Sequence, residues 1–215
     1  MLYDLSPRVD GSTPVWPGDT PYSCTLAWAI ENGASVNVTA LHTTPHVGAH
    51  VDAPFHFDSR GATAADLPLE PFLGRCVVIE VPRGPLVLPE HLAGIDLARV
   101  ERVLIRTGSM GDRAVFPEDF MALAPATAEL LARHGVRLAG LDSPSMDPFT
   151  SKTLDAHKAL WRGEVSILEG LRLDGVPPGE YELIALPLPL AGACASPVRA
   201  VLRSLRGPNY WEETP

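Results

Sequence analysis

The segment from Leu41 to Asp58, LHTTPHVGAHVDAPFHFD, limits the fold of this chain more than any other stretch. It carries four of the seven histidines, and its polar and apolar residues alternate. One set of alternate positions reads His42, Thr44, His46, Gly48, His50, Asp52, Pro54 and His56; the other reads Leu41, Thr43, Pro45, Val47, Ala49, Val51, Ala53, Phe55 and Phe57. A period of two is typical of an extended segment with a buried back and a functional front. We therefore expect the imidazoles and the carboxylate to share one face.

A straight strand would not bring these imidazoles to one metal ion. At roughly 3.3 Å per residue, His46 and His50 would lie about 13 Å apart. Two imidazoles on one zinc must be much closer, because Zn–N bonds are about 2.0–2.1 Å long. Gly48 permits a bend between them, and a single helical turn would also bring positions i and i+4 together. The residues alone leave both alternatives open.

The histidine segment favours a metal site over ordinary surface or core histidines. Clustering imidazoles and a carboxylate on one face is costly unless a metal or a catalytic task compensates. The residues expected at this site are His46, His50, Asp52 and His56. The histidines without such neighbours are expected to make ordinary structural contacts: His42, His91 and His134.

A second group lies far along the chain, where SKTLDAH ends in His157 and VSILEG contains Glu169. A histidine and a glutamate at this separation indicate little by themselves, and a glutamate after an apolar run is usually a surface charge. The apolar surroundings of Glu169 in Ser166–Leu168 would bury its charge, which then needs a neutralising partner.

The rest of the chain predicts a mixed α/β domain. Four short apolar runs read as buried strands: Cys76–Val81, Arg102–Thr107, Val136–Asp142 and Leu183–Leu188. One short helix is expected to open at Pro89, and a longer one at Pro125 with Gly135 closing it. The first 57 residues and the late SPVRAVLRSL stretch look rich in strands. More than one sheet layer is therefore expected in an α/β arrangement.

Composition excludes several classes of protein. A chain of 215 residues fits one domain, and its net charge of -9 argues against a nucleic-acid or anionic-membrane partner. The apolar run Leu183–Ala195 is too short to span a bilayer, which needs about 20 apolar residues. No signal peptide is visible in the sequence. A cytoplasmic location is therefore expected. Cys24, Cys76 and Cys194 form no CxxC pair, so we expect reduced thiols and no cysteine zinc site.

The run from His46 to Phe57 resembles the HxGxHxDxPxH motif of the cyclase-like metal hydrolases. More narrowly, the chain resembles their bacterial kynurenine formamidase group, also called arylformamidases. The histidine motif alone specifies only the wider family, whereas Trp-Pro-Gly-Asp and SKTLDAH are more specific. The resemblance covers about residues 1–206 and leaves the tail 207–215 unassigned. Its other matching segments are Thr13–Pro21, Leu141–Pro148, Ser151–His157, Ile167–Leu171, and PPGEYELIALPL followed by ASPVRAVLR.

This resemblance implies a compact single domain of the swivelling β/β/α type that forms homodimers and binds two zinc ions. One zinc would be held by His46, His50 and Asp52; the other by Asp52, His157 and Glu169. The resemblance also implies that His56 is the general acid/base. Pro54 should turn the chain away from the ligand run, so that His56 stands beside the metals. Trp16 would line the substrate pocket. Val47 and Phe57 depart from the Thr and Tyr common in the family, which leaves the ligands intact but alters pocket polarity.

The implied reaction is hydrolysis of a small aromatic formamide, N-formyl-L-kynurenine, to L-kynurenine and formate. Zinc fits the nitrogen and oxygen ligands, although manganese would accept a similar set. An alternative enzyme would act on another aryl amide or on a cyclic amide such as isatin, although relatives of that type tend to be longer chains. A metal-stabilised binding protein is the non-enzymatic alternative, and a free His56 beside the metals argues against it.

Overall fold

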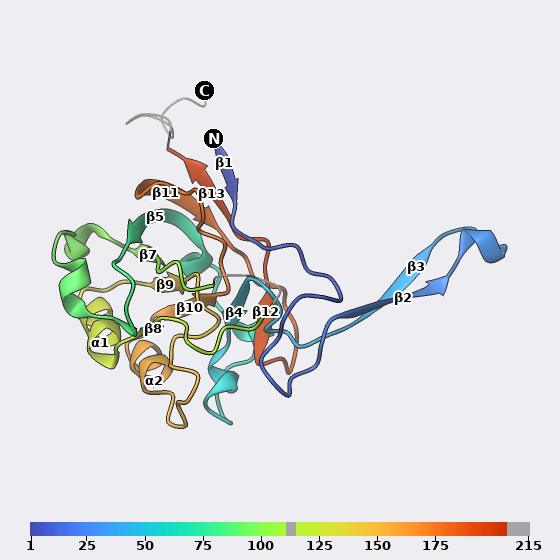
Figure 1. Ribbon diagram of the computed structural model, residues 1–215, viewed down its shortest axis with the longest axis horizontal. Coiled ribbons are helices and arrows are strands. Elements are labelled where there is room, and N and C mark those ends of the chain that lie inside the picture. Colours follow the sequence, from blue (N-terminus) through green and yellow to red (C-terminus); the bar gives the residue numbers. More distant parts are fainter. Residues whose placement is uncertain (111–114, 206–215) are drawn as a thin grey trace.

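The computed structural model describes residues 1–110 and 115–205, and its main element is a nine-stranded mixed sheet (Figure 1). The tail 207–215, left unassigned above, lies outside the described residues. Across the sheet the strands follow the order β1 (Leu2–Asp4), β13 (Val201–Ser204), β11 (Gly179–Ile184), β5 (Leu73–Glu80), β7 (Arg102–Arg106), β9 (Leu138–Leu141), β10 (Ser166–Glu169), β4 (His50–Asp52) and β12 (Ala195–Pro197).

The strand directions divide this sheet into a parallel centre and antiparallel flanks. Strands β5, β7, β9 and β10 run parallel to one another, and the remaining pairs are antiparallel. A second, two-stranded parallel sheet pairs β6 (Leu86–Val87) with β8 (Ala122–Leu123). The expected α/β class with several sheet layers is therefore confirmed.

Alternate residues of the central strands enter two different hydrophobic cores. On β7, Val103 and Ile105 belong to one core, while Leu104 belongs to the other. This follows from the two-residue period of a strand, and it explains why the strand is apolar at successive positions. The first core includes Leu131 from the helix Pro125–Arg133 and Leu160 from the helix Asp155–Arg162, so these helices cover one face of the sheet.

Helix α1 (Pro125–Arg133) begins at the expected proline, whose missing N–H is harmless in a first turn. Gly135 follows its end with a φ of 73°, in the left-handed region that favours glycine. Helix α2 (Asp155–Arg162) was not expected from the sequence. Within the described chain, no helix is both long and apolar enough to cross a membrane.

In residues 1–110 and 115–205, six short 3-10 turns connect these elements: η1 (Ile30–Asn32), η2 (Pro54–His56), η3 (Ala64–Asp66), η4 (Glu70–Phe72), η5 (Pro89–Leu92) and η6 (Leu97–Arg99). The helix expected at Pro89 is the single turn η5. Its His91 ring accepts a hydrogen bond from the Leu88 backbone N–H at 3.1 Å, which is the ordinary structural role expected of this histidine.

A hairpin of β2 (Ser23–Trp28) and β3 (Val38–His42) extends away from the body of the molecule (Figure 1). We call residues 23–42 the arm. Every residue of both strands is exposed, including the large apolar side chains of Leu26, Trp28 and Leu41. The expectation that Leu41 lies on a buried back is therefore wrong. Its alternation belongs to the exposed arm rather than to the core.

The strand expected at Leu183–Leu188 is found at Gly179–Ile184, so its bounds were placed too late. Leu186 and Leu188 are 43% and 52% exposed. Pro187 and Pro189 have no N–H to donate to a ladder, which ends the strand in this region. The early residues join the sheet because they pair with β5, a contact that local sequence does not reveal.

Candidate metal centre

The bend between His46 and His50 occurs at Gly48, which has a φ of 65°. The backbone from residue 43 to 49 has no regular secondary structure, and the strand β4 begins only at His50. Of the two alternatives that the sequence leaves open, the bent chain is correct. The bend brings the imidazole rings of His46 and His50 to a centroid separation of 4.9 Å.

The buried back of this segment is confirmed for Val47, Ala49, Val51 and Ala53, which are at most 3% exposed. The pattern ends at Phe55, which is 39% exposed and was expected to be buried. The reason is that the chain leaves the sheet at Pro54 and enters the turn η2.

Strand pairing places Glu169 beside His50. The two residues are direct partners across the antiparallel pair β4 and β10, so their side chains lie on the same face of the sheet. His50 Nε2 is 3.3 Å from Glu169 Oε2, and both side chains are almost completely buried. His50 Nδ1 contacts the Gly48 carbonyl oxygen at 3.0 Å, which leaves Nε2 directed at the centre.

Helix α2 brings His157 to the same point. Its Nε2 lies 3.3 Å from Asp52 Oδ2 and 3.3 Å from Glu169 Oε1. Its Nδ1 lies 2.6 Å from Asp147 Oδ2, and Asp147 also accepts the backbone N–H groups of Ala156 and His157. Asp147 therefore caps the start of α2 and orients the His157 ring, as outer carboxylates commonly do for histidine ligands.

Asp52 is at the middle of the cluster. Its Oδ1 is 3.1 Å from His46 Nδ1 and 3.5 Å from His50 Nε2. Both of its oxygens are buried, yet among the described residues neither has a hydrogen-bond partner of acceptable geometry. One potential metal-ligand atom from each of His46, His50 and Asp52 lies within 4.8 Å of the other two.

These contacts fit a divalent metal better than a hydrogen-bond network. A buried carboxylate without proper donors is costly in a folded protein. Here the nitrogen and oxygen lone pairs approach one another without hydrogen-bond geometry, as they do when they face a common ion. Imidazole and carboxylate are also the ligand types that zinc accepts. The residues present therefore fit a metal site of this class.

Protons and metal ions compete for this centre. Burial by itself raises the pKa of Asp52, but the imidazoles of His157 and His46 outweigh it and hold the pKa well below its ordinary value. Burial lowers the pKa of His46, yet the Asp52 carboxylate raises it to about 10. Because histidine binds metals as the neutral ring, an incoming ion must displace the proton on His46.

His56 stands at the edge of the centre. It ends the turn η2 that begins at Pro54, so the chain turns where the proline predicted. Its ring centroid is 4.3 Å from that of His46 and 6.1 Å from that of His157. The protein atoms packed around the ring lower the pKa of His56, although the Asp52 carboxylate acts in the opposite direction. The ring is therefore neutral near pH 7 and able to accept a proton.

A cavity of about 750 Å³ opens above these residues, and His46, His50, His56, His157 and Glu169 all line it. This volume is in the range of small-molecule sites. Trp16 lines the same cavity, where its ring lies against Phe149 and Phe116 at centroid distances of 5.0 and 5.3 Å. All seven residues expected at the site are thus close to this cavity or directly beneath it.

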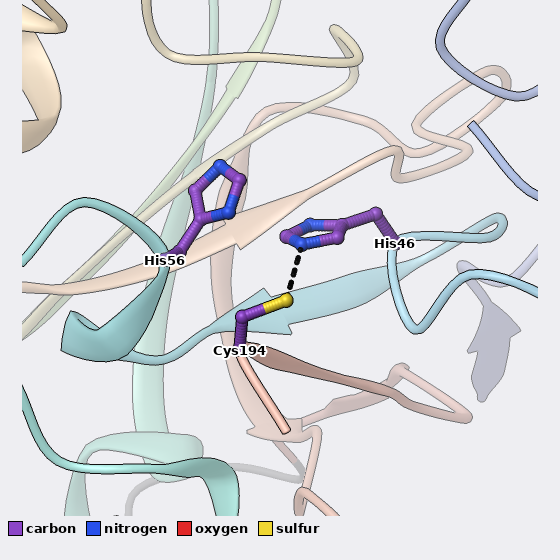
Figure 2. A group of neighbouring side chains, drawn as sticks. All are labelled: His46, His56 and Cys194. Carbon is purple, nitrogen blue, oxygen red and sulfur yellow. Dashed lines mark hydrogen bonds between the residues drawn. The ribbon is translucent and has the colours of Figure 1, made fainter. Parts of the chain in front are cut away.

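Two residues of this neighbourhood were missed by the sequence analysis. Asp147, in LDSPSMDP, orients His157 as described above. Cys194 Sγ lies 3.3 Å from His46 Nε2 (Figure 2). The spacing of neither residue suggested a role, because each is distant in sequence from the histidine that it contacts.

Comparison with known proteins identifies the family of this chain. Residues 3–148 match the family described as putative cyclase. The chain is 54% identical over 206 residues to the kynurenine formamidase of Bordetella avium, covering 95% of this chain and 98% of that one. It is 51% identical over 205 residues to the kynurenine formamidase of Bordetella pertussis, with the same coverage.

Solved structures share the fold. A potential metal-dependent hydrolase with cyclase activity superposes with a TM-score of 0.84 at 27% identity, covering 96% of this chain and 99% of that one. Isatin hydrolase A from Labrenzia aggregata gives a TM-score of 0.82 at 23% identity, covering 96% and 94%, which shows a common fold. The chain therefore belongs to the cyclase family and is a metal-dependent amidohydrolase.

Proposed function

We propose that this enzyme hydrolyses N-formyl-L-kynurenine to L-kynurenine and formate, as a cytoplasmic homodimer that uses two zinc ions per chain. The observation that carries the chemistry is the buried Asp52 carboxylate, which faces three imidazoles without a hydrogen-bond donor of its own. The substrate follows from the kynurenine formamidases that match 95% of the chain at 51–54% identity.

The donor atoms divide into two sets around Asp52. Oδ1 faces His46 Nδ1 and His50 Nε2, and Oδ2 faces His157 Nε2. Glu169 approaches both sets, with Oε2 near His50 and Oε1 near His157. We therefore propose that His46, His50 and Asp52 would hold one ion and that Asp52, His157 and Glu169 would hold the other.

Bound zinc of this kind activates water near neutral pH and polarises a carbonyl oxygen. The chain's own task is to supply and remove protons. The leaving aryl amine needs a proton, and the neutral His56 ring can take one from the attacking water and return it to the amine. We assign His56 to proton transfer rather than to the ligands, since it lies at the cavity wall on the turn η2, with one ring nitrogen within 4.8 Å of ligand atoms of Asp52 and His157.

The cavity suits an aromatic amino acid. The Trp16 ring is 36% exposed and forms part of the cavity wall, where it offers a flat face to an aniline ring. Arg8 and Arg172 line the same cavity, so the end of the substrate that carries a carboxylate can meet a positive charge.

The direct test is an absorbance assay with N-formylkynurenine before and after chelation, with metal content measured in parallel. The proposal expects turnover that is lost with the metal and restored when zinc is added. A second assay with isatin addresses the alternative cyclic-amide substrate, which the fold shared with isatin hydrolase A raises. Faster turnover of isatin than of the formamide would contradict the proposed substrate.

Trp16→Ala is expected to lower kcat/KM for the aromatic substrate by up to about tenfold, because an aromatic pair contributes about 0.5–1.5 kcal/mol. Metal content should not change. Trp161→Ala is a matched control, since Trp161 is similarly exposed at 39% but does not line the cavity. If Trp16→Ala unfolds by circular dichroism or loses metal, Trp16 is a structural anchor of the Phe116 and Phe149 cluster instead.

The arm is the feature that supports a homodimer. Leu26 and Trp28 are 55% and 62% exposed, and large apolar side chains gathered on one projecting hairpin are typical of an interface. The double variant Leu26→Ser with Trp28→Ser should run as a monomer in light scattering, whereas the wild type runs as a dimer. Leu69→Ser changes an equally exposed leucine outside the arm and should remain dimeric. A monomeric wild type, or a dimeric double variant, would show that the arm has another role.

A further inference from the structure

Cys194 is brought to the metal centre by β12, the edge strand of the nine-stranded sheet. It directly precedes β12, which pairs with β4 so that Ala195 is opposite Asp52. The Cys194 carbonyl accepts the backbone N–H of Ala53 at 2.9 Å, which continues this pairing by one residue. The thiol therefore lies beside the chain that runs from Asp52 to His56.

Three potential metal ligands meet there on three separate elements. They are His46 from the bend, His56 from η2 and Cys194 from the start of β12 (Figure 2). One ligand atom from each lies within 4.8 Å of the others. Cys194 Sγ is 3.3 Å from His46 Nε2, and the His46 and His56 rings are 4.3 Å apart. Figure 2 shows the Cys194 sulfur directed at the His46 ring and the His56 ring beside that of His46.

The two ring nitrogens of His46 face different potential metal ligands. Nδ1 lies 3.1 Å from Asp52 Oδ1, on the side of the nitrogen and oxygen ligands. Nε2 lies toward the sulfur of Cys194. A neutral imidazole has a single free lone pair, so His46 can serve one of these sets at a time.

We propose that His46, His56 and Cys194 form an alternative site for a thiophilic ion, such as Cd²⁺ or Zn²⁺ in excess, and that its occupation inhibits the enzyme. Two nitrogens and a sulfur suit soft or borderline ions and exclude Mg²⁺, Ca²⁺ and Mn²⁺, which prefer oxygen. Binding forms a metal–sulfur bond and releases to solvent the thiol proton and any proton on the two ligating imidazole nitrogens.

The inhibitory effect follows from the residues that the site removes, and this part rests on the proposed function. The ion takes His56, which the proposed mechanism uses to carry protons. It also places the lone pair of His46 on Nε2, toward Cys194, so that Nδ1 no longer offers one toward Asp52. One ion would thus withdraw a proton carrier and a ligand together.

The binding test does not need turnover. Metal-free full-length protein is titrated with Cd²⁺, and the ultraviolet charge-transfer absorption of a cadmium–thiolate bond is followed. We expect one such bond per chain. Cys194→Ser and Cys194→Ala should both abolish it, and His56→Gln should weaken the binding. Cys24→Ser is the matched control, because Cys24 is an exposed thiol on the arm and far in sequence from the site. Cys76→Ser controls for the buried thiol.

Activity gives a second comparison, in which Cd²⁺ should inhibit Cys194→Ser at least tenfold less potently than Cys24→Ser. Circular dichroism verifies the fold of each variant. The proposal is overturned if the wild type gives no thiolate band, or if the band survives Cys194→Ser. It is also overturned if Cys194→Ser only weakens zinc at the Asp52 set, since the sulfur would then simply orient His46. Failure of the formamide assay with an intact thiolate band would instead overturn the proposed function alone.

Discussion

Asp52→Ala is expected to bind neither metal ion and to lose essentially all turnover. Asp52 Oδ1 faces His46 and His50, and its Oδ2 faces His157. Its removal takes a shared ligand from both ions at once. Elemental analysis of purified protein, together with the formamide assay, measures the result.

Two comparisons make this prediction specific. His157→Ala should chiefly weaken the second ion, because the His157 ring lies near Asp52 Oδ2 and Glu169 Oε1, the oxygens assigned to that ion. Asp52→Asn and Asp142→Asn compare two equally buried carboxylates, which are 5% and 2% exposed. Asp142 accepts hydrogen bonds from Thr107 and Gly108 rather than facing the histidines, so its variant should keep the metal. If Asp52→Ala retains a full metal load, the ligand assignment is wrong.

His56→Ala is expected to keep its metal ions and its fold but to lose about 10²–10⁴-fold in turnover, the usual contribution of a general acid/base. Removing a metal ligand would instead remove metal and activity together. His56 sits on the turn after Pro54, with its ring at the cavity wall, and burial lowers its pKa, so the ring is neutral near pH 7 and can accept a proton.

Turnover of formamides with different leaving amines gives a more specific test of this role. A formamide with a more acidic leaving amine needs less protonation, so His56→Ala should impair its hydrolysis less. His42→Ala changes an exposed histidine on the arm and should leave both substrates unaffected. Loss of zinc in proportion to activity would make His56 a ligand. Near-normal turnover would mean that another group delivers the proton.

Local sequence determined those features that depend on neighbouring residues. The spacing of His46, His50 and Asp52 predicted a metal site, and Gly48 supplied the bend because its backbone reaches a positive φ without strain. Pro125 and Gly135 marked the limits of α1 for similar reasons of backbone geometry. Such features need only the conformational preferences of the residues concerned.

Tertiary structure alone decided which distant residues meet at this bend. Glu169 faces His50 because β10 pairs with β4 in one register, and a shift by one residue would send its carboxylate to the other face. Cys194 reaches His46 through the pairing of β12 with β4. The resemblance to a known family had pointed to His157 and Glu169, but it said nothing of Cys194. Strand register depends on the packing of the whole sheet, and this is why neither contact follows from local sequence.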